Sequence, residues 1–481
     1  MKNGRLKLTS LVVMVALGMS ACMNEDLFST SGSQAKTDYL SAGVITGFGS
    51  VYINGVEFET DDTQFNIDDA EGAESQLKIG MYITLEGNIN EDGLTGQAAS
   101  IIFENEVEGI VLAKDINAGV GTMDVMGQTV VIDLDTKFES DIAEIRVIDD
   151  VELDQMVEVS GYASGIGKIY ATRVELKRAE YTEGEEIELK GIVSALNDST
   201  FVIGLMTIDY TSAQFEDFDT MVLANGMYVE VKSTEGINVD NQLVASKIEL
   251  ESDKGKGEKR EDGKEMEIEG VVTASVATDR TSVEINGQTV VLNMNTEYEY
   301  GSIDGVIVGA KVEVEGEFDS DDRFVADKIK FRQKAEIKME GFIESVDSDA
   351  GTVLVFGQTI KVNNLTFMED DKNEHDVESI KYFNLDHIAV GDFVEIKAYL
   401  ESNGEMLAAK FKREDAEDDG QVKLEGNIDS VSENGQLTVA GITVDVSALN
   451  SSSQFVEGVK VEIKGFFSDG VFSASKISLE D

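Results

Sequence analysis

One short pattern of strands recurs six times along this chain of 481 residues, and such a recurrence decides the fold before any single motif does. Each copy opens with a glycine-led strand such as GVITGFG, continues to a strand of the VEVEG type and ends with a strand such as VADKIKF. The copies, named repeats 1 to 6 here, span residues 43–108, 109–180, 187–251, 267–334, 338–413 and 422–479. The chain is therefore predicted to be a tandem array of small modules.

Within each repeat, apolar and polar residues alternate with a period of two, which is the pattern of half-buried β-strands. In repeat 4, for example, Val312 and Val314 are expected to face the core while Glu313 and Glu315 face water. Each repeat contains five such runs, and a variable stretch long enough for a short helix follows the third. This layout predicts an all-β protein, a tandem array of six small five-stranded OB-like β-barrels.

A glycine phrase between the second and third runs reads INGQTVVL at 285–292, VMGQTVVI at 125–132 and VFGQTIKV at 355–362. It is either a copied site or a turn that every repeat needs. Repeat 6 has Ala440, Gly441 and Ile442 at this place, so the glycine is shared while glutamine and threonine are replaceable. Because glycine supplies the positive φ that a tight hairpin needs, the phrase is predicted to be a turn.

The longest joint between repeats is SDKGKGEKREDGKEM at 252–266, which carries five basic and five acidic residues and no apolar periodicity. We expect a flexible, solvated linker there, dividing the array into two groups of three repeats. A shorter joint of the same kind lies at 414–421.

The N-terminus has the features of a targeting segment. Positive residues at the start precede the apolar run LVVMVAL at 11–17, and Met19, Ser20 and Ala21 precede Cys22, the single cysteine of the chain. This arrangement resembles the lipobox of bacterial lipoproteins, which implies a signal peptide at 1–21, a lipid on Cys22 and a flexible tether at 22–42. An ordinary signal peptide with a chance cysteine and a short membrane anchor are the alternatives.

The lipobox reading also bears on location. Under the sorting rule of enteric bacteria, an aspartate directly after the lipidated cysteine retains a protein at the inner membrane, but Met23 stands there. The expectation is therefore a lipid-anchored envelope protein, at the outer rather than the inner membrane, facing the periplasm or the cell surface.

The charge of the chain narrows the classes of partner. Its 94 acidic residues against 39 basic residues give a formal net charge of −55. A surface this acidic repels the phosphates of nucleic acids and anionic headgroups, which bind through lysine and arginine. Nucleic acid is excluded as an expected partner, whereas cations or basic proteins suit this charge.

Catalytic motifs are missing from the sequence. The two histidines, His375 and His387, both lie in the variable stretch of repeat 5, whereas a zinc site needs three or four nitrogen or sulfur ligands. No nucleophile elbow, zinc-protease helix or phosphate loop is present. The chain is therefore predicted not to be an enzyme and to need no cofactor, apart from weakly bound calcium.

Several acidic turns are candidate calcium sites. Carboxylates are placed as in calcium loops in the stretch DDTQFNIDDAEG at 61–72, in the turn with Asp319, Asp321 and Asp322, and in the turn with Asp347 and Asp349. The turn at 347–351 lacks the later glutamate of such a loop. The alternative interpretation is that these turns are simply solvated. Weak binding of divalent cations at many surface sites is favoured over one tight site.

The string GVITGFGSVYINGVEFET at 43–60, followed by LKIGMYITLEG at 77–87, resembles the DUF5666 domain of bacterial envelope proteins. That family has no established activity. The resemblance implies a β-rich envelope module that is often repeated, and it supplies no catalytic residues.

These observations favour a non-enzymatic envelope lipoprotein that presents its repeats as a structural or binding array, with an unknown envelope protein or a glycan as partner. One alternative is a calcium-responsive array for adhesion or matrix building. Another is a binder of glycan or peptide polymers, which would rely on tyrosine and phenylalanine because the chain has no tryptophan.

Overall fold

The computed structural model describes residues 36–481 except 49, 91–92, 118–119, 134, 144, 146, 165, 252–262, 333–336, 364–365, 371–382, 402–403, 417–419, 433–435, 450–454 and 480–481. Across these residues the chain is all-β, as predicted, and the short helix expected after the third strand is a single 3-10 turn where one occurs. No helix in this part of the chain is long and apolar enough to cross a membrane. The predicted signal peptide, Cys22 and His375 lie outside the described residues.

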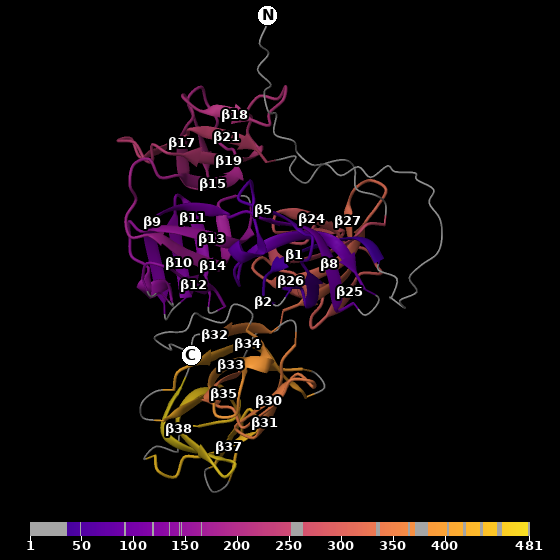
Figure 1. Cartoon of the computed structure of the whole chain (residues 1–481), viewed down its shortest axis with the longest axis vertical. Helices are drawn as coiled ribbons and strands as arrows, with labels where there is room; N and C mark the ends of the chain where they lie inside the picture. Colours follow the sequence, from indigo (N-terminus) through magenta and orange to yellow (C-terminus); the bar gives the residue numbers. More distant parts are fainter. Residues whose placement is uncertain are drawn as a thin grey trace, which may run out of the picture. The chain divides into compact units, whose positions relative to one another are not determined.

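Repeat 2 shows the architecture in full, and its first strand begins at Val107, two residues before the predicted start of the repeat, so Val107 and Glu108 are counted with repeat 2 from here on. Its five main strands pair in the closed order β9–β10–β11–β14–β13–β9, and the pairing of β11 with β14 is parallel while the others are antiparallel. These strands gather into one body in Figure 1. The elements are β9 (Val107–Asn117), β10 (Val120–Val125), β11 (Gln128–Ile132), β12 (Lys137–Glu139), η2 (Ile148–Asp150), β13 (Met156–Ala163) and β14 (Lys168–Arg178).

Repeat 6 is the second closed barrel, with the order β35–β36–β37–β39–β38–β35. Repeat 4 makes the same five pairings. The strands of repeat 6 are β35 (Val422–Val431), β36 (Leu437–Val439), β37 (Ile442–Asp445), β38 (Lys460–Ser468) and β39 (Val471–Leu479). Those of repeat 4 are β22 (Glu265–Ala274), β23 (Ser282–Ile285), β24 (Gln288–Val291), β25 (Glu297–Glu299), β26 (Lys311–Phe318) and β27 (Phe324–Phe331), with η3 at Ile303–Gly305.

The remaining repeats keep this order but interrupt one strand, so the described residues do not form a closed ring of five unbroken strands in every repeat. The first strand is split in repeats 1 and 5, and the fifth in repeat 3.

Repeat 1 contains β1 (Lys36–Val44), β2 (Gly47–Phe48), β3 (Val51–Ile53), β4 (Val56–Glu59), β5 (Gln64–Ile67), β6 (Ala70–Glu71), η1 (Glu74–Gln76), β7 (Tyr82–Ile89) and β8 (Thr95–Phe103). Repeat 3 contains β15 (Ile187–Ile192), β16 (Thr200–Ile203), β17 (Met206–Asp209), β18 (Gln214–Glu216), β19 (Tyr228–Ser233), β20 (Gln242–Val244) and β21 (Lys247–Leu250). Repeat 5 contains β28 (Ile337–Phe342), β29 (Ser345–Asp347), β30 (Thr352–Val355), β31 (Gln358–Lys361), β32 (Phe367–Asp370), η4 (Leu385–His387), β33 (Phe393–Leu400) and β34 (Met406–Glu414).

The glycine phrase is a turn, as predicted. Gly127 has a φ of 75° and the preceding Met126 a φ of 49°, and Gly441 and Ala440 have 74° and 51°. Two consecutive residues with positive φ form the type I′ turn, whose twist matches that of the strands it joins. The glycine therefore serves the hairpin.

The repeats associate in pairs through their first strands. Strand β1 of repeat 1 pairs in parallel with β22 of repeat 4, whereas β9 pairs antiparallel with β15 and β28 antiparallel with β35. The expected division into two groups of three is therefore wrong, because repeat 1 joins repeat 4 across the predicted linker. Strand β22 also begins at Glu265, inside that linker, whose residues 252–262 lie outside the described part.

The two antiparallel joints share one register. Val107 lies opposite Leu189, and Met339 lies opposite Leu424. Each of these residues stands two positions before the opening glycine of its repeat, so equivalent residues face each other across a local twofold axis. One apolar core spans repeats 2 and 3 and another spans repeats 5 and 6. Repeats 1 and 4 have distinct core clusters, although Ala42 of β1 belongs to the repeat 4 cluster and Tyr82 of β7 packs against it.

Because some repeats share a core and others do not, a core substitution should destabilise the neighbouring repeat only where the core is shared. Phe411 in repeat 5 is fully buried in the core shared with repeat 6, so Phe411→Ala should cost about 3–5 kcal/mol and also lower amide protection in β38. Hydrogen exchange at increasing urea concentration measures both effects.

The matched control is Phe324→Ala in repeat 4, where the buried ring belongs to a separate core. Strand β8 of repeat 1, whose buried residues belong to the other cluster, should keep its protection in that variant. Equal loss in the neighbouring repeat of both variants would contradict the assignment of shared and separate cores.

Candidate functional site

The outward faces of the paired sheets carry the charged residues of the VEVEG strands. Alternation places Val229 and Val231 of β19 in the core, and Glu230 therefore points to the opposite face. That face is not open water, because Glu230 is only 2% exposed. The same holds in repeat 4, where the side chain of Glu313 is 15% exposed and that of Glu315 is 42% exposed. The expectation that these glutamates face water is therefore wrong for the more buried of them.

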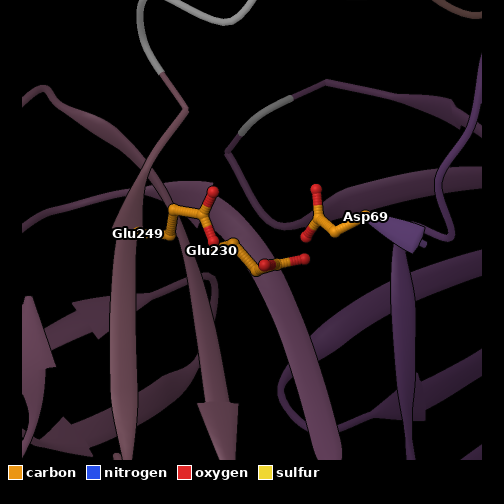
Figure 2. Close-up of side chains that lie close together, drawn as sticks. All are labelled: Asp69, Glu230 and Glu249. Carbon is orange, nitrogen blue, oxygen red and sulfur yellow. The ribbon is translucent and has the colours of Figure 1, made fainter. Parts of the chain in front are cut away.

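The first cluster of carboxylates joins repeats 1 and 3. Glu230 lies directly opposite Glu249 of β21, and Asp69 comes from the tight turn between β5 and β6. One oxygen of each carboxylate lies within 4.8 Å of the others. Figure 2 shows the three side chains converging from these separate segments. We name Asp69, Glu230 and Glu249 the first acidic cluster.

Lysines lie among these carboxylates. The Nζ of Lys232 lies 3.5 Å from Asp69 Oδ2, 3.4 Å from Glu230 Oε2 and 2.9 Å from Glu188 Oε1. The Nζ of Lys247 lies 2.8 Å from Glu249 Oε2. Burial alone would lower the pKa of Lys232, but the hydrogen bond and charge of Glu188 outweigh it and raise that pKa. Ammonium groups thus compensate part of the charge of the cluster, and we assign no metal site to it.

A second cluster joins Glu267 of β22 to Glu313 and Glu315 of β26. Glu267 lies directly opposite Glu315, and the hydroxyl of Tyr39 donates a hydrogen bond to Glu267. Burial and the charge of Glu313 raise the pKa of Glu267 well above its ordinary value. Lys328 lies 2.6 Å from Glu315, so this cluster is also partly compensated within the protein.

The aspartates predicted to bind calcium are held by their own turns. Asp319 Oδ1 accepts hydrogen bonds from the amides of Asp321 and Arg323, and its Oδ2 accepts from Arg323 Nη2 at 2.6 Å. Asp347 Oδ1 accepts from the amide of Ala350 at 2.9 Å. Asp321, Asp322 and Asp349 do not join Asp319 or Asp347 in any group of three carboxylates within ligand reach among the described residues. Calcium binding at these turns remains a prediction.

His387 is exposed and its Nδ1 lies 2.8 Å from Asn384 Oδ1, at the start of the 3-10 turn η4. Asn384 also accepts a hydrogen bond from the amide of Asp386 and so caps this turn. The contact of His387 with Asn384 is therefore a contact within the turn.

A groove of about 720 Å³ lies where the glycine turns of repeats 5 and 6 meet. Gln358 Nε2 donates to the carbonyl of Gly441 at 3.4 Å across this junction. The lining residues are small, polar or aliphatic, and none is aromatic, so the groove offers no stacking surface for a sugar ring.

The sequence analysis did not find either cluster, because each brings together residues that are distant in the chain, such as Asp69 with Glu230 and Glu267 with Glu313. Glu230 and Glu313 occupy alternate strand positions that look identical to solvated positions in the sequence. The signal that could have drawn attention to them is the repeated glutamate of the VEVEG phrase.

Comparison with known proteins identifies the repeats. The sequence matches the family described as "Domain of unknown function (DUF5666)" at residues 42–101, 108–175, 190–249, 269–330, 340–411 and 425–478. Among curated proteins no relative matches the chain.

Among solved structures, the chain is similar to a multidomain protein with nucleic acid binding domains from Streptococcus pneumoniae TIGR4. The identity is 12%, the match covers 50% of this chain and 76% of that chain, and the TM-score is 0.12.

Removing the lysine between the carboxylates tests its compensating role. Lys232→Met leaves Asp69, Glu188 and Glu230 without their shared cation, so we expect a loss of about 3 kcal/mol in stability at pH 7. Because burial raises the pKa of Glu230, protonation should make the loss smaller at pH 5. Urea denaturation at the two pH values measures this.

Lys247→Met is the matched control, since its side chain is 26% exposed against 10% for Lys232. Its loss should be about 1 kcal/mol or less. Equal losses in the two variants would count against a special role for Lys232.

Proposed function

The chain belongs to the DUF5666 family, and from this premise we propose that it is a non-enzymatic bacterial envelope lipoprotein that presents six repeats as a structural or binding array. The observation that supports this most is the sixfold recurrence of one domain over most of the sequence after residue 41. A chain made of paired copies of one small module offers a long surface rather than one enclosed site.

We propose that the chain has neither a catalytic activity nor a cofactor. The observation in favour is that the carboxylates that lie closest together are paired with other side chains of the protein. Lys232 and Lys247 pair with the first acidic cluster, and Tyr39 and Lys328 engage the second. Acid–base catalysis needs carboxylates aimed at a substrate, whereas these are directed at partners within the protein.

The proposed place of action is the outer membrane, facing the periplasm or the cell surface, with Cys22 carrying the lipid. The proposed partner is an envelope protein or a glycan. The net charge of −55 supports the exclusion of nucleic acid, because phosphate backbones bind to basic surfaces.

Lipidation has a direct test. Cells that express the chain and receive an alkyne analogue of palmitate should label the wild type, and the protein should sediment with membranes. Cys22→Ser should remove the label and release the protein into the soluble fraction. Label or membrane association that persists in this variant would contradict the proposed anchor.

A calcium-responsive array is the second candidate, favoured by the two clusters of carboxylates. Thermal unfolding of residues 23–481 in calcium chloride and in sodium chloride of equal ionic strength separates the two. Since lysines already compensate part of the charge of both clusters, we expect both salts to raise the melting temperature equally, by screening self-repulsion. A rise specific to calcium would favour the second candidate instead.

A polymer-binding role has the groove between the turns of repeats 5 and 6 in its favour. Without aromatic side chains in its lining, this groove suits an extended peptide better than a glycan.

A further inference from the structure

The two antiparallel joints have the same geometry but different charges. At the joint of repeats 5 and 6, Lys338 lies opposite Glu425 and Glu340 lies opposite Lys423, so unlike charges face each other. At the positions of repeats 2 and 3 that are equivalent to Glu340 and Lys423, Glu108 lies opposite Glu188. Like charges directly opposite each other destabilise a strand pair.

The row of residues through Glu108 extends this difference across four adjacent strands. Glu175 of β14 lies opposite Glu158 of β13, Glu158 opposite Glu108 of β9, and Glu108 opposite Glu188 of β15. We name these residues the glutamate row. The equivalent row of repeats 5 and 6 reads Lys412, Glu395, Glu340 and Lys423, which balances.

Other charged groups face Glu108 from the neighbouring elements. Lys177 of β14 contributes positive charge, and Asp68, from the turn of repeat 1 that covers the joint, adds negative charge to that of Glu158 and Glu188. Lys177 is engaged elsewhere, since its Nζ lies 2.8 Å from Glu158 Oε2 and 3.7 Å from Glu175 Oε1. Glu188 likewise pairs with Lys232 at 2.9 Å. Glu108 therefore sits in the middle of the row without a lysine of its own among the ion pairs of the described residues.

The joint between repeats 2 and 3 also has the shorter strand pairing of the two antiparallel joints. Strands β9 and β15 pair over two residues, Glu108 and Val107 against Glu188 and Leu189, whereas β28 and β35 pair over three. With fewer ladder hydrogen bonds, the joint of repeats 2 and 3 depends more on the charge state of its outer face.

We propose that the joint between repeats 2 and 3 is a pH-sensitive hinge, which is closed when the glutamate row holds a proton and loosens when the row is fully ionised. The joint of repeats 5 and 6 has the same register and lacks this response. The hinge does not depend on the lipid anchor or on the identity of any partner.

The stability of the closed joint depends on pH because protonation of the glutamates is linked to pairing of the strands. Burial, together with the charges of Glu158, Glu188 and Asp68 and against that of Lys177, raises the pKa of Glu108 to about 7. Burial likewise raises the pKa of Glu106 to about 7, with Lys190 opposing and Glu104 adding to the shift. In an open joint both pKa values return toward 4.5. The closed joint therefore binds more protons, so its stability is full at acidic pH and is lost as the pH rises through about 7.

Hydrogen exchange of the full-length chain at pH 6 and pH 8, corrected for the intrinsic exchange rate, tests the hinge. Protection in β9 and β15 should fall roughly tenfold or more relative to β28 and β35, which serve as the reference in the same molecule. An equal change in both joints would overturn the proposal.

Glu108→Gln keeps the shape of the side chain and removes its charge, so it should retain protection at pH 8 and flatten the pH response. Glu340→Gln, at the equivalent position of repeat 5, should weaken its joint at both pH values because Lys338 and Lys423 lose a partner. A pH response that persists unchanged in Glu108→Gln would overturn the role of the row. Should that variant fold poorly, Glu158→Gln, which also removes one charge from the row, should reduce the response.

Discussion

The hydrogen-bonded pairing of first strands is the interaction on which the rest of this structure depends. A module of about 60–75 residues buries only a modest fraction of its surface and is marginal alone. Pairing β9 with β15, and β28 with β35, lets two modules share one continuous core. Because equivalent residues meet across a local twofold axis, one solution serves both pairs. Repeat 1 joins repeat 4 by a parallel pairing instead, and there the two core clusters are distinct, with Ala42 of β1 as a member of the repeat 4 cluster.

Pairing has a consequence for charge. Once two sheets are continuous, the outward positions of their strands form one charged face that other segments of the chain cover in part. Asn105, between repeats 1 and 2, donates hydrogen bonds to Asp68 and Glu188, and Lys190 pairs with Glu104 at 2.6 Å. Taking such groups out of water costs free energy that only well-placed partners offset. Interleaved lysines and glutamates are therefore a requirement of the architecture, and they account for the engagement of the closest carboxylates without any ligand.

The sequence was sufficient for what lies within one repeat. Alternation such as that of Val312 and Val314 predicted the core side of each strand, and Gly441 and its equivalents predicted the hairpin turns. It was not sufficient for what lies between repeats, since periodicity does not state which strand lies beside another. The pairing of Ala42 with Ile268 brings together residues from opposite sides of the predicted linker. For the same reason the acidic turns that contain Asp69 and Asp319 could be predicted from the sequence, whereas the approach of Asp69 to Glu230 across repeats could not.

Equivalent positions with unequal charges are where a repeat array can acquire separate properties without changing its fold. A core residue such as Met339 or Leu424 at the axis is constrained by packing against its own counterpart, so variation there disturbs both modules. The outward residues next to it are constrained only by the sum of charges around them. Replacing a lysine such as Lys423 by a glutamate such as Glu188 at the same site leaves the strand, its register and its core unchanged, but it alters how many protons the joint binds near neutral pH. Differences in outward charge among the six repeats can therefore give individual joints different properties while the fold stays the same.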